Sequence, residues 1–244
     1  MKRIRSLIFA ALPAVLLSAC GGTSNSDALV SDPLEGLNRG THIFNKTVDR
    51  AVLRPASQAY GVVAPDLFKM MFGNAVSHLS LPGVFVNNVL QGDADAAVST
   101  LGRFVINTVG GAGVLDPATE GGLPAENTDF GLTLATWGVN EGPYIELPFL
   151  GPSTARDAVG QVVDIAFQPT TYLTGGTEVQ LVTAGVRGLG IVDLRERNAA
   201  LIDDLLYRSE DSYVSVRASY VQNRRRLASG GETDVDALPD LFSE

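Results

Sequence analysis

The stretch SDPLEGLNRGTHIFNKTVDRAVLRP, residues 31–55, decides the fold class. Its apolar residues recur at an approximately helical spacing, which predicts an amphipathic helix. The members of this apolar stripe are Leu34, Leu37, Ile43, Phe44, Val48 and Val52. Asp32 is the expected N-cap and Pro33 suits the first turn, whereas Pro55 is expected to end the helix.

Later segments repeat this spacing and extend the helical prediction over most of the chain. The further predicted helices cover residues 65–82, 91–111, 152–167 and 193–228. Asp93 or Gly92 is expected to cap the helix over 91–111, and the last helix is expected to break at 209–211, where capping residues occur together. Because no segment alternates clearly between polar and apolar residues, the predicted fold class is all-α.

Two segments lack the helical pattern. Residues 115–136 are rich in glycine and proline and are predicted to form loops. Residues 142–152 are predicted to be extended, although they hold too many prolines for a central strand. The glycine-rich run at 110–113 follows a helix and lacks a Gly-Lys-Ser/Thr sequence, so it is predicted to be a turn between helices and not a phosphate loop.

Several predicted helices contain glycine, at Gly73, Gly102 and Gly160. In water, each such glycine costs up to about 1 kcal/mol relative to alanine. Glycine within helices is commoner where helices meet lipid or pack closely against each other. The glycines therefore favour a helical protein that touches a membrane or is tightly packed.

The N-terminus reads as a bacterial lipoprotein signal. Basic residues in MKRIRS precede an apolar run from Leu7 to Leu17 that is too short to span a bilayer. The sequence LSAC then places the only cysteine, Cys20, after two small residues, as a lipobox requires. We predict a signal peptide over residues 1–19 and acylation of Cys20. The alternative is an ordinary secretion signal with a stray cysteine.

The mature chain is predicted to have three parts. Residues 20–31 are small and polar and read as a flexible tether behind the acyl chains, which anchor a protein stably when there are two or more. Gly21 follows the cysteine in place of the aspartate that tends to retain lipoproteins in the inner membrane, so the outer membrane is expected. Residues 32–228 form the predicted helical domain, and residues 229–244 form a predicted disordered acidic tail.

The composition excludes one class of function. The chain has 244 residues, 45% of them hydrophobic, which is enough for a sizeable core. Its net charge of −9 argues against a nucleic-acid binder, since such a protein needs basic residues to neutralise phosphates. The basic run at 224–226 is expected to be a solvated helix end, with contact to lipid headgroups as the less favoured interpretation.

Ser153 is a candidate nucleophile, but its surroundings disfavour catalysis. It lies in GPSTA, which lacks the second glycine of the nucleophile elbow G-x-S-x-G. A triad also needs a histidine, and both His42 and His78 lie within predicted helices. Ser153 or Thr154 is therefore predicted to cap a helix. Two distant histidines and a modified Cys20 make no zinc site, and no metal or other cofactor is expected.

Six stretches resemble the MlaA/VacJ family of outer-membrane lipoproteins, and they occur in the order found in that family. They are DPLEGLNR (32–39), LQGD (90–93), GRFVINT (102–108), LDPA (115–118), TDFGLTLATWGV (128–139) and GPYIELPFLGPSTARDAVG (142–160). The last stretch is the most specific, and the resemblance covers about residues 32–227. It implies a ring-like, all-α domain that lies in the inner leaflet of the outer membrane and has an amphipathic pore through its middle.

The resemblance also implies a function and partners. Members of the family associate with trimeric porins of the OmpC/OmpF kind, and they pass phospholipids misplaced in the outer leaflet to an MlaC-like periplasmic carrier, which maintains lipid asymmetry. The chain is accordingly expected to be a phospholipid-transport component and not an enzyme. The alternatives are a phospholipase-like hydrolase that uses Ser153, and a structural lipoprotein that braces a porin.

Two pairs of residues are candidates for lipid contact. Glu146 makes its stretch more polar than the resemblance implies, and a carboxylate facing lipid is costly, so Glu146 is expected to face the pore, headgroups or water. Tyr144 is the second candidate for pore or headgroup contact. Ile43 and Phe44 are candidates for the membrane interface, with packing in the core as an equal alternative.

We predict that Cys20→Ala abolishes acylation, because the diacylglyceryl group of a lipobox protein is attached to the cysteine thiol. Growth with labelled palmitate, followed by gel electrophoresis, measures the acylation. Labelling that persists in the variant would refute the lipobox.

Overall fold

The computed structural model describes residues 31–172 and 176–230. Helices dominate this part of the chain, and its only strands are two short ones, which confirms the all-α class. The predicted signal peptide over 1–19, nearly all of the tether over 20–31 and most of the tail over 229–244 lie outside the described residues.

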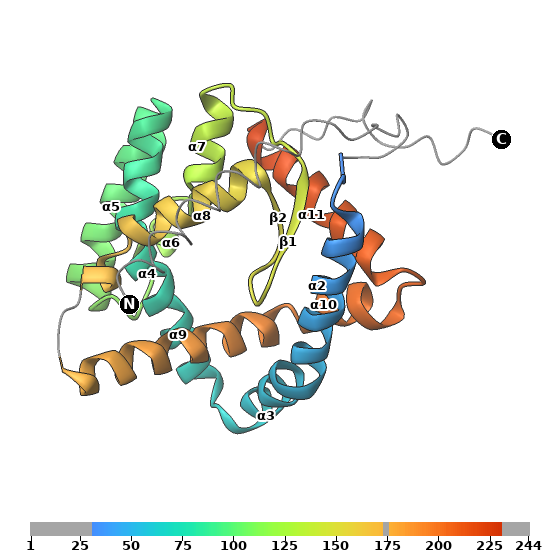
Figure 1. Ribbon diagram of the computed structural model, residues 1–244. Coiled ribbons are helices and arrows are strands. Elements are labelled where there is room, and N and C mark those ends of the chain that lie inside the picture. The colour runs from blue at the N-terminus through green and yellow to red at the C-terminus, as the bar shows by residue number, and fades with distance from the viewer. Residues whose placement is uncertain (1–30, 173–175, 231–244) are drawn as a thin grey trace.

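The helices are arranged in a ring, and one β-hairpin projects into it beside α2 (Figure 1). In chain order the elements are α2 (Glu35–Val48), η2 (Asp49–Leu53), α3 (Arg54–Val63), α4 (Asp66–Gln91), α5 (Ala94–Gly111), α6 (Pro117–Glu120), α7 (Phe130–Thr136), β1 (Tyr144–Leu147), β2 (Gly151–Thr154), α8 (Ala155–Phe167), η3 (Pro169–Tyr172), α9 (Thr177–Arg197), α10 (Ala199–Asp203), η4 (Asp204–Arg208) and α11 (Ser212–Ala228). Around the ring, α3 packs on α9, α9 on α4, α4 on α8, and α7 on α11, which returns beside α2.

Side-chain caps explain where several helices begin. Asp93 and Thr154 each accept a hydrogen bond from the backbone N–H three residues further on, at 2.9 and 3.2 Å. Asp211 caps α11 by accepting two backbone N–H groups at 3.0 and 3.2 Å, which confirms the break predicted at 209–211. Of the two residues predicted to cap this helix, Thr154 is the cap of α8, and Ser153 lies within β2.

The first helix has different ends from those predicted. Asp32 does not cap α2; its carboxylate accepts a hydrogen bond from the Asn38 side chain at 2.8 Å. Pro55 does not end the helix, because the chain passes through the π-helical turn η2 directly into α3. Pro55 then lies in the first turn of α3, directly after η2, where the chain departs from regular α-helical hydrogen bonding.

Other boundaries also differ from the predictions. Residues 115–136 contain two short helices, α6 and α7, which Asp116 and Asp129 cap. Both helices are only one or two turns long, so neither shows a helical periodicity, and the glycine and proline content of the segment predicted loops instead. The helix expected to start at residue 193 begins at Thr177, and the one expected over 65–82 runs through Pro82 to the end of α4.

The β-hairpin was not predicted. β1 and β2 pair antiparallel, with Tyr144 opposite Thr154 and Leu147 opposite Gly151. Prolines disfavour central strands, but a two-stranded sheet has only edge strands, so Pro152 is tolerated. Phe149 and Gly151, with φ of 65° and 81°, turn the chain between the strands.

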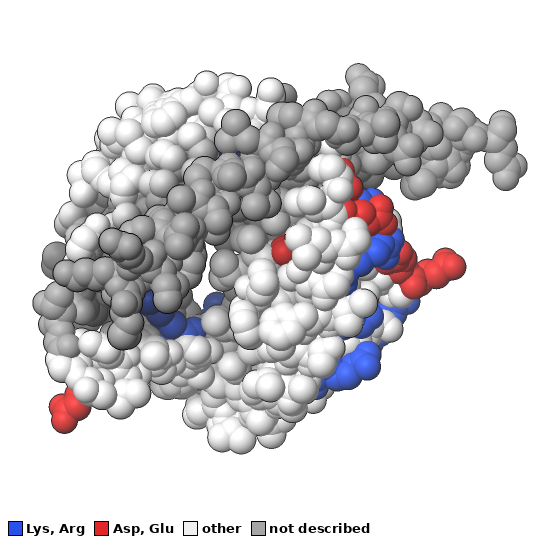
Figure 2. Space-filling view, viewed as in Figure 1, with Lys and Arg blue, Asp and Glu red and all other residues white. Residues whose placement is uncertain are grey.

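The polarity of the ring is inverted relative to a soluble protein. On α2 the buried side chains are Asn38 and His42, whereas Ile43 of its apolar stripe is 65% exposed. On α5, Val98 and Val109 are 71% and 83% exposed. Most of the described surface visible in Figure 2 is uncharged, and most of the charged side chains that it shows gather at the edge beside α2. The exposure of so many large apolar side chains marks a surface that contacts lipid or protein.

No helix in the described ranges is both long enough and apolar enough to cross a bilayer.

We predict that Gly160→Ala destabilises the ring. An added Cβ would lie 2.4 Å from the backbone nitrogen of Gly131, where α8 meets α7. Overpacking of this kind costs about 1–3 kcal/mol, and each kcal/mol lowers the Tm by about 2–4 °C. Circular dichroism during heating in detergent measures the Tm. Gly188→Ala in α9 is the control, because nothing lies within 4 Å of its Cβ position and its Tm is expected to hold or rise. Equal shifts in both variants would contradict the close packing.

Candidate functional site

A cavity of about 560 Å³ lies between α2, the hairpin tip, the α10–η4 segment and α11. Its volume falls within the range of small-molecule sites, about 300–1,000 Å³. The apolar side chains that line it are Val48, Leu53, Phe149, Leu150, Leu201, Ile202, Leu205, Leu206 and Val216. The charged side chains Lys46, Asp49 and Glu146 also reach it. A mostly apolar wall with a few charges suits an amphiphilic ligand.

One polar face of α2 positions the hairpin. Asn38, His42 and Asn45 are about one helical turn apart, so they point in the same direction. Asn38 makes hydrogen bonds to two backbone groups of β1, at 2.9 and 3.0 Å. Asn45 donates to the Leu147 carbonyl at 3.0 Å and accepts from the Phe149 N–H at 2.8 Å. The outer edge of β1 is thereby paired with side chains in place of a third strand.

The Glu146 carboxylate lies in the cavity wall, with its side chain only 2% exposed. One oxygen lies 3.0 Å from His42 Nδ1 and 3.4 Å from Asn45 Nδ2. The other accepts a hydrogen bond from the Tyr144 hydroxyl at 2.8 Å. On the far side of the imidazole, His42 Nε2 lies 3.0 Å from Ser212 Oγ. The expected contact of Glu146 with the lipid path stays a prediction, and these partners confine its carboxylate to the wall.

Tyr144 lies behind Glu146 and does not line the cavity. It is fully buried and packs edge-on against Tyr213, with ring centroids 5.9 Å apart. Burial, and then the adjacent Glu146 charge, raise the pKa of Tyr144 above its ordinary value, so its hydroxyl remains a donor. Direct headgroup contact by Tyr144 does not fit this burial; its hydroxyl instead supports the Glu146 carboxylate.

Ion pairs hold the wall where α2 continues into η2. Arg195 of α9 donates to both oxygens of Asp49, at 3.1 and 3.2 Å, and to Asp203 at 2.5 Å. Tyr207 of η4 donates to Asp49 at 2.7 Å. Burial, and then this hydrogen bond, raise the pKa of Tyr207 to about 12. The charge of Asp49 is therefore balanced inside the protein.

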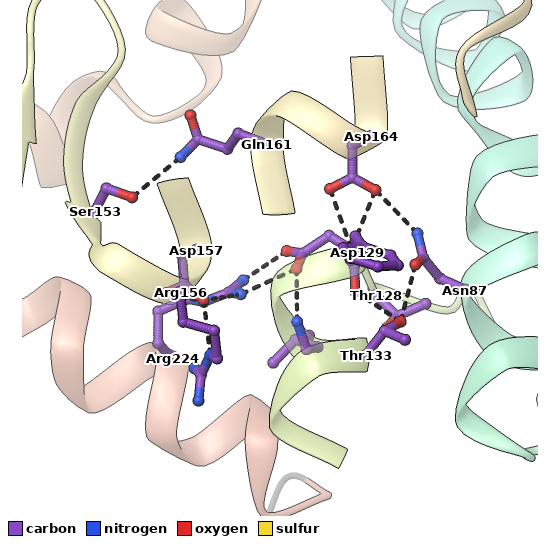
Figure 3. A network of polar contacts seen from close by, with 12 residues as sticks. Asn87, Thr128, Asp129, Thr133, Ser153, Arg156, Asp157, Gln161, Asp164 and Arg224 are labelled. Carbon is purple, nitrogen blue, oxygen red and sulfur yellow. Dashed lines mark hydrogen bonds and ion pairs between the residues drawn. The ribbon is translucent and has the colours of Figure 1, made fainter. Parts of the chain in front are cut away.

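A second polar network joins α7, α8 and α11 (Figure 3). Arg224 donates to the Asp129 oxygens at 2.6 and 3.0 Å and to the Asp157 oxygens at 2.9 and 3.1 Å. Burial favours the neutral acid, but Arg224 outweighs it and holds the pKa of Asp157 below its ordinary value. The prediction of a solvated helix end is wrong for Arg224, because the end of α11 packs between two acidic helix starts.

Most of the chain matches one known protein family. A family profile described as MlaA lipoprotein matches residues 30–227. The chain belongs to the MlaA lipoprotein family. A protein of Escherichia coli K12 named "Intermembrane phospholipid transport system lipoprotein MlaA" is 34% identical over an alignment of 237 positions, which covers 94% of this chain and 91% of that protein. Its namesake in Haemophilus influenzae is 31% identical over an alignment of 246 positions, which covers 98% of this chain and 97% of that protein.

A solved structure resembles this MlaA-family chain in fold. It was reported as "Structural basis for maintenance of bacterial outer membrane lipid asymmetry". The two superpose with a TM-score of 0.70 at 34% identity, over 81% of this chain and 99% of the other. The resemblance therefore extends over the ring, and the family expectation for its shape is confirmed.

Ser153 of this MlaA-family chain has a structural role in the hairpin. Its side chain is fully buried in β2. Its Oγ donates to the Thr154 carbonyl at 3.1 Å and accepts from Gln161 at 3.4 Å (Figure 3). His42 and His78 form their hydrogen bonds with other residues. Within the described ranges, no group of histidine, cysteine or acidic side chains is arranged to hold a metal ion.

Ile43 and Phe44, the candidates for the membrane interface, lie on the outer face of α2. They are 65% and 42% exposed, so the alternative that they pack in the core is wrong. The Phe44 ring meets Phe149 at the hairpin tip edge to face, with centroids 5.0 Å apart. Contact of this aromatic pair with the membrane stays a prediction.

Asn38, Asn45 and Lys46 are site residues that were not predicted from the sequence. The available signal was their spacing, because Asn38, His42 and Asn45 recur on one face of a predicted helix. A polar helix face usually meets water, so the spacing alone does not reveal that this face is the interior one.

We predict that Glu146→Ala destabilises the protein by about 3 kcal/mol, because two buried groups, the His42 imidazole and the Tyr144 hydroxyl, lose their hydrogen-bond partner. Glu146→Gln keeps one acceptor oxygen and is expected to cost about 1 kcal/mol. Urea unfolding in detergent measures both free energies. Glu178→Ala, at an exposed position of α9, is the control and is expected to change stability by less than about 0.5 kcal/mol. A loss for Glu146→Ala as small as that of the control would contradict the role of the carboxylate.

Proposed function

We propose that this chain is an outer-membrane lipoprotein that removes mislocalised phospholipids from the outer leaflet and passes them to a periplasmic carrier. Its relatives carry the name of an intermembrane phospholipid transport system, and its structural neighbour concerns outer-membrane lipid asymmetry, which supports the proposal. The ring would lie in the inner leaflet, held at the periplasmic face by acyl chains on Cys20.

The inverted polarity of the ring is the observation that carries this proposal. Apolar side chains such as Phe44 and Val109 cover its outside, while polar side chains fill its inside. Helices satisfy their own backbone hydrogen bonds, so such a ring can lie among acyl chains without unpaired polar groups. The cavity beside α2 adds an apolar space with charged groups in its wall, as a phospholipid requires.

We infer two protein partners from membership of the family, a trimeric porin of the OmpC/OmpF kind and an MlaC-like periplasmic carrier. Copurification from membranes solubilised in mild detergent tests the porin. Transfer of labelled phospholipid from the purified protein to the carrier tests the second partner.

We also propose that the protein is not an enzyme. The strongest alternative is a phospholipase-like hydrolase, and it would need Ser153 accessible beside a general base. The burial of Ser153 and its bonds to a carbonyl and an amide support transport without hydrolysis.

Deletion of the gene is expected to raise the amount of phospholipid in the outer leaflet, because nothing then removes it. Chemical labelling of aminophospholipid on intact cells measures this amount. Genes for the wild-type protein and for Ser153→Ala are both expected to restore the low level. A lipoprotein that only braces a porin predicts no rise on deletion, so an unchanged level would overturn the transport proposal.

The hydrolase is tested with the purified protein. Incubation with labelled phospholipid is expected to release no fatty acid. Release that disappears in Ser153→Ala, while the Tm stays the same, would establish the hydrolase in place of the transporter.

A further inference from the structure

We infer that the cavity beside α2 binds phospholipids of net negative charge in preference to zwitterionic ones, and that Lys46 selects them by binding the phosphate. The inference rests on the proposed function and names the class of lipid that this site takes. Its basis is the balance of charges in the cavity wall.

Lys46 is the charge in this wall that the protein leaves uncompensated. Its Nζ donates to Ser212 Oγ at 3.0 Å and lies 5.6 Å from the centroid of the Tyr207 ring. No carboxylate in the described parts of the chain forms an ion pair with it. An ammonium group at the edge of a mostly apolar cavity is well placed to bind a phosphate oxygen.

The two carboxylates that line the cavity are already engaged. Asp49 accepts hydrogen bonds from Arg195 and Tyr207, and its side chain is 8% exposed. Glu146 has partners on both oxygens and is less exposed still. A ligand ammonium group would therefore find no free carboxylate in the wall and would have to displace buried hydrogen bonds to reach one.

A second cation strengthens the positive potential beside Lys46. The Arg50 guanidinium lies 5.3 Å from the centroid of the same Tyr207 ring, and its residue is exposed. As with Lys46, no described carboxylate pairs with it. Arg54 also lies over this ring, at 4.7 Å, but Asp203 compensates it at 2.9 Å. Two uncompensated cations thus flank one aromatic ring, and their field attracts an anion.

The apolar wall supplies the place for an acyl chain. Side chains from the hairpin tip, α10, η4 and α11 form a continuous surface: Phe149, Leu150, Leu201, Leu205, Leu206 and Val216. A chain lying against them leaves water, which favours binding without selecting among headgroups. Selection then falls to the headgroup. Phosphatidylglycerol offers its phosphate to Lys46, whereas phosphatidylethanolamine also brings an ammonium group that the two cations repel.

Isothermal titration of the full-length lipoprotein in a non-ionic detergent tests the inference with dihexanoyl phosphatidylglycerol and dihexanoyl phosphatidylethanolamine. The wild-type protein is expected to bind the anionic lipid about tenfold more tightly, because both lipids offer a phosphate to Lys46 but only phosphatidylethanolamine brings an ammonium group near the cations. Lys46→Gln is expected to abolish the preference, and Lys46→Arg to keep it. Arg208→Gln is the matched control: Arg208 lies on η4 but pairs with Asp204, so its loss is expected to leave the preference unchanged.

Leu205→Trp tests the position of the acyl chain, because the larger side chain fills the cavity. It is expected to weaken binding of both lipids several-fold and to leave their ratio unchanged. Binding unchanged in this variant would place the lipid elsewhere and overturn the site. Glycerophosphoglycerol, which has no acyl chains, is expected to compete poorly; competition equal to that of the lipid would assign the site to free phosphate esters.

Equal affinity of the wild-type protein for the two lipids, or a preference that survives Lys46→Gln, would overturn the selectivity. Neither result would contradict the proposed function, because that function is tested by the amount of outer-leaflet phospholipid in the deletion strain. Conversely, an unchanged outer leaflet together with a tenfold preference in titration would refute transport and leave the binding site standing.

Discussion

The hydrogen bonds between α2 and β1 are the interaction on which the rest of the structure depends. A two-stranded hairpin alone is marginally stable, and here its open edge has no third strand. Asn38 and Asn45 occupy that edge by bonding its backbone groups, and His42 between them bonds Glu146. The hairpin is thus fixed against α2 inside the ring, and Phe149 at its tip becomes part of the cavity wall.

Ion pairs take the place that an apolar core has in a soluble protein. Replacing a buried ion pair by apolar residues is often neutral or stabilising, so pairs such as Arg195–Asp49 or Arg224–Asp157 are poor sources of net stability. Their contribution here is to fix the orientation of the helices. The outward faces of ring helices such as α2 and α5 are already apolar. An apolar inward face would therefore not determine which of the two faces points into the ring. A guanidinium that reaches carboxylates on two other elements fixes which face points inward and which elements meet.

This inversion explains what the sequence reveals and what it hides. Helical periodicity identifies the helices, because the spacing of an apolar stripe is the same in water and in lipid. It does not reveal that Phe44 points outward or that Arg224 is buried, since both depend on the medium and on distant partners. Local rules failed at Pro55 for a related reason. The fixed φ of proline is compatible both with the first turn of a helix and with the residue after a helix end. The π-helical turn η2 before Pro55 allows the helix to continue, and the local sequence does not reveal that turn.

The irregular turns themselves mark the cavity. The π-helical segments η2 and η4 are far apart in sequence, yet Tyr207 of η4 donates to Asp49 of η2 at 2.7 Å. Each also lends side chains to the cavity wall, Leu53 from η2 and Leu205 from η4 among them. A π-helical turn gives up regular helical hydrogen bonding, and such turns are frequent at functional sites. Because two such turns meet at one wall, we infer that regular helical geometry is given up there to form the cavity, and the Tyr207–Asp49 hydrogen bond holds the two turns together.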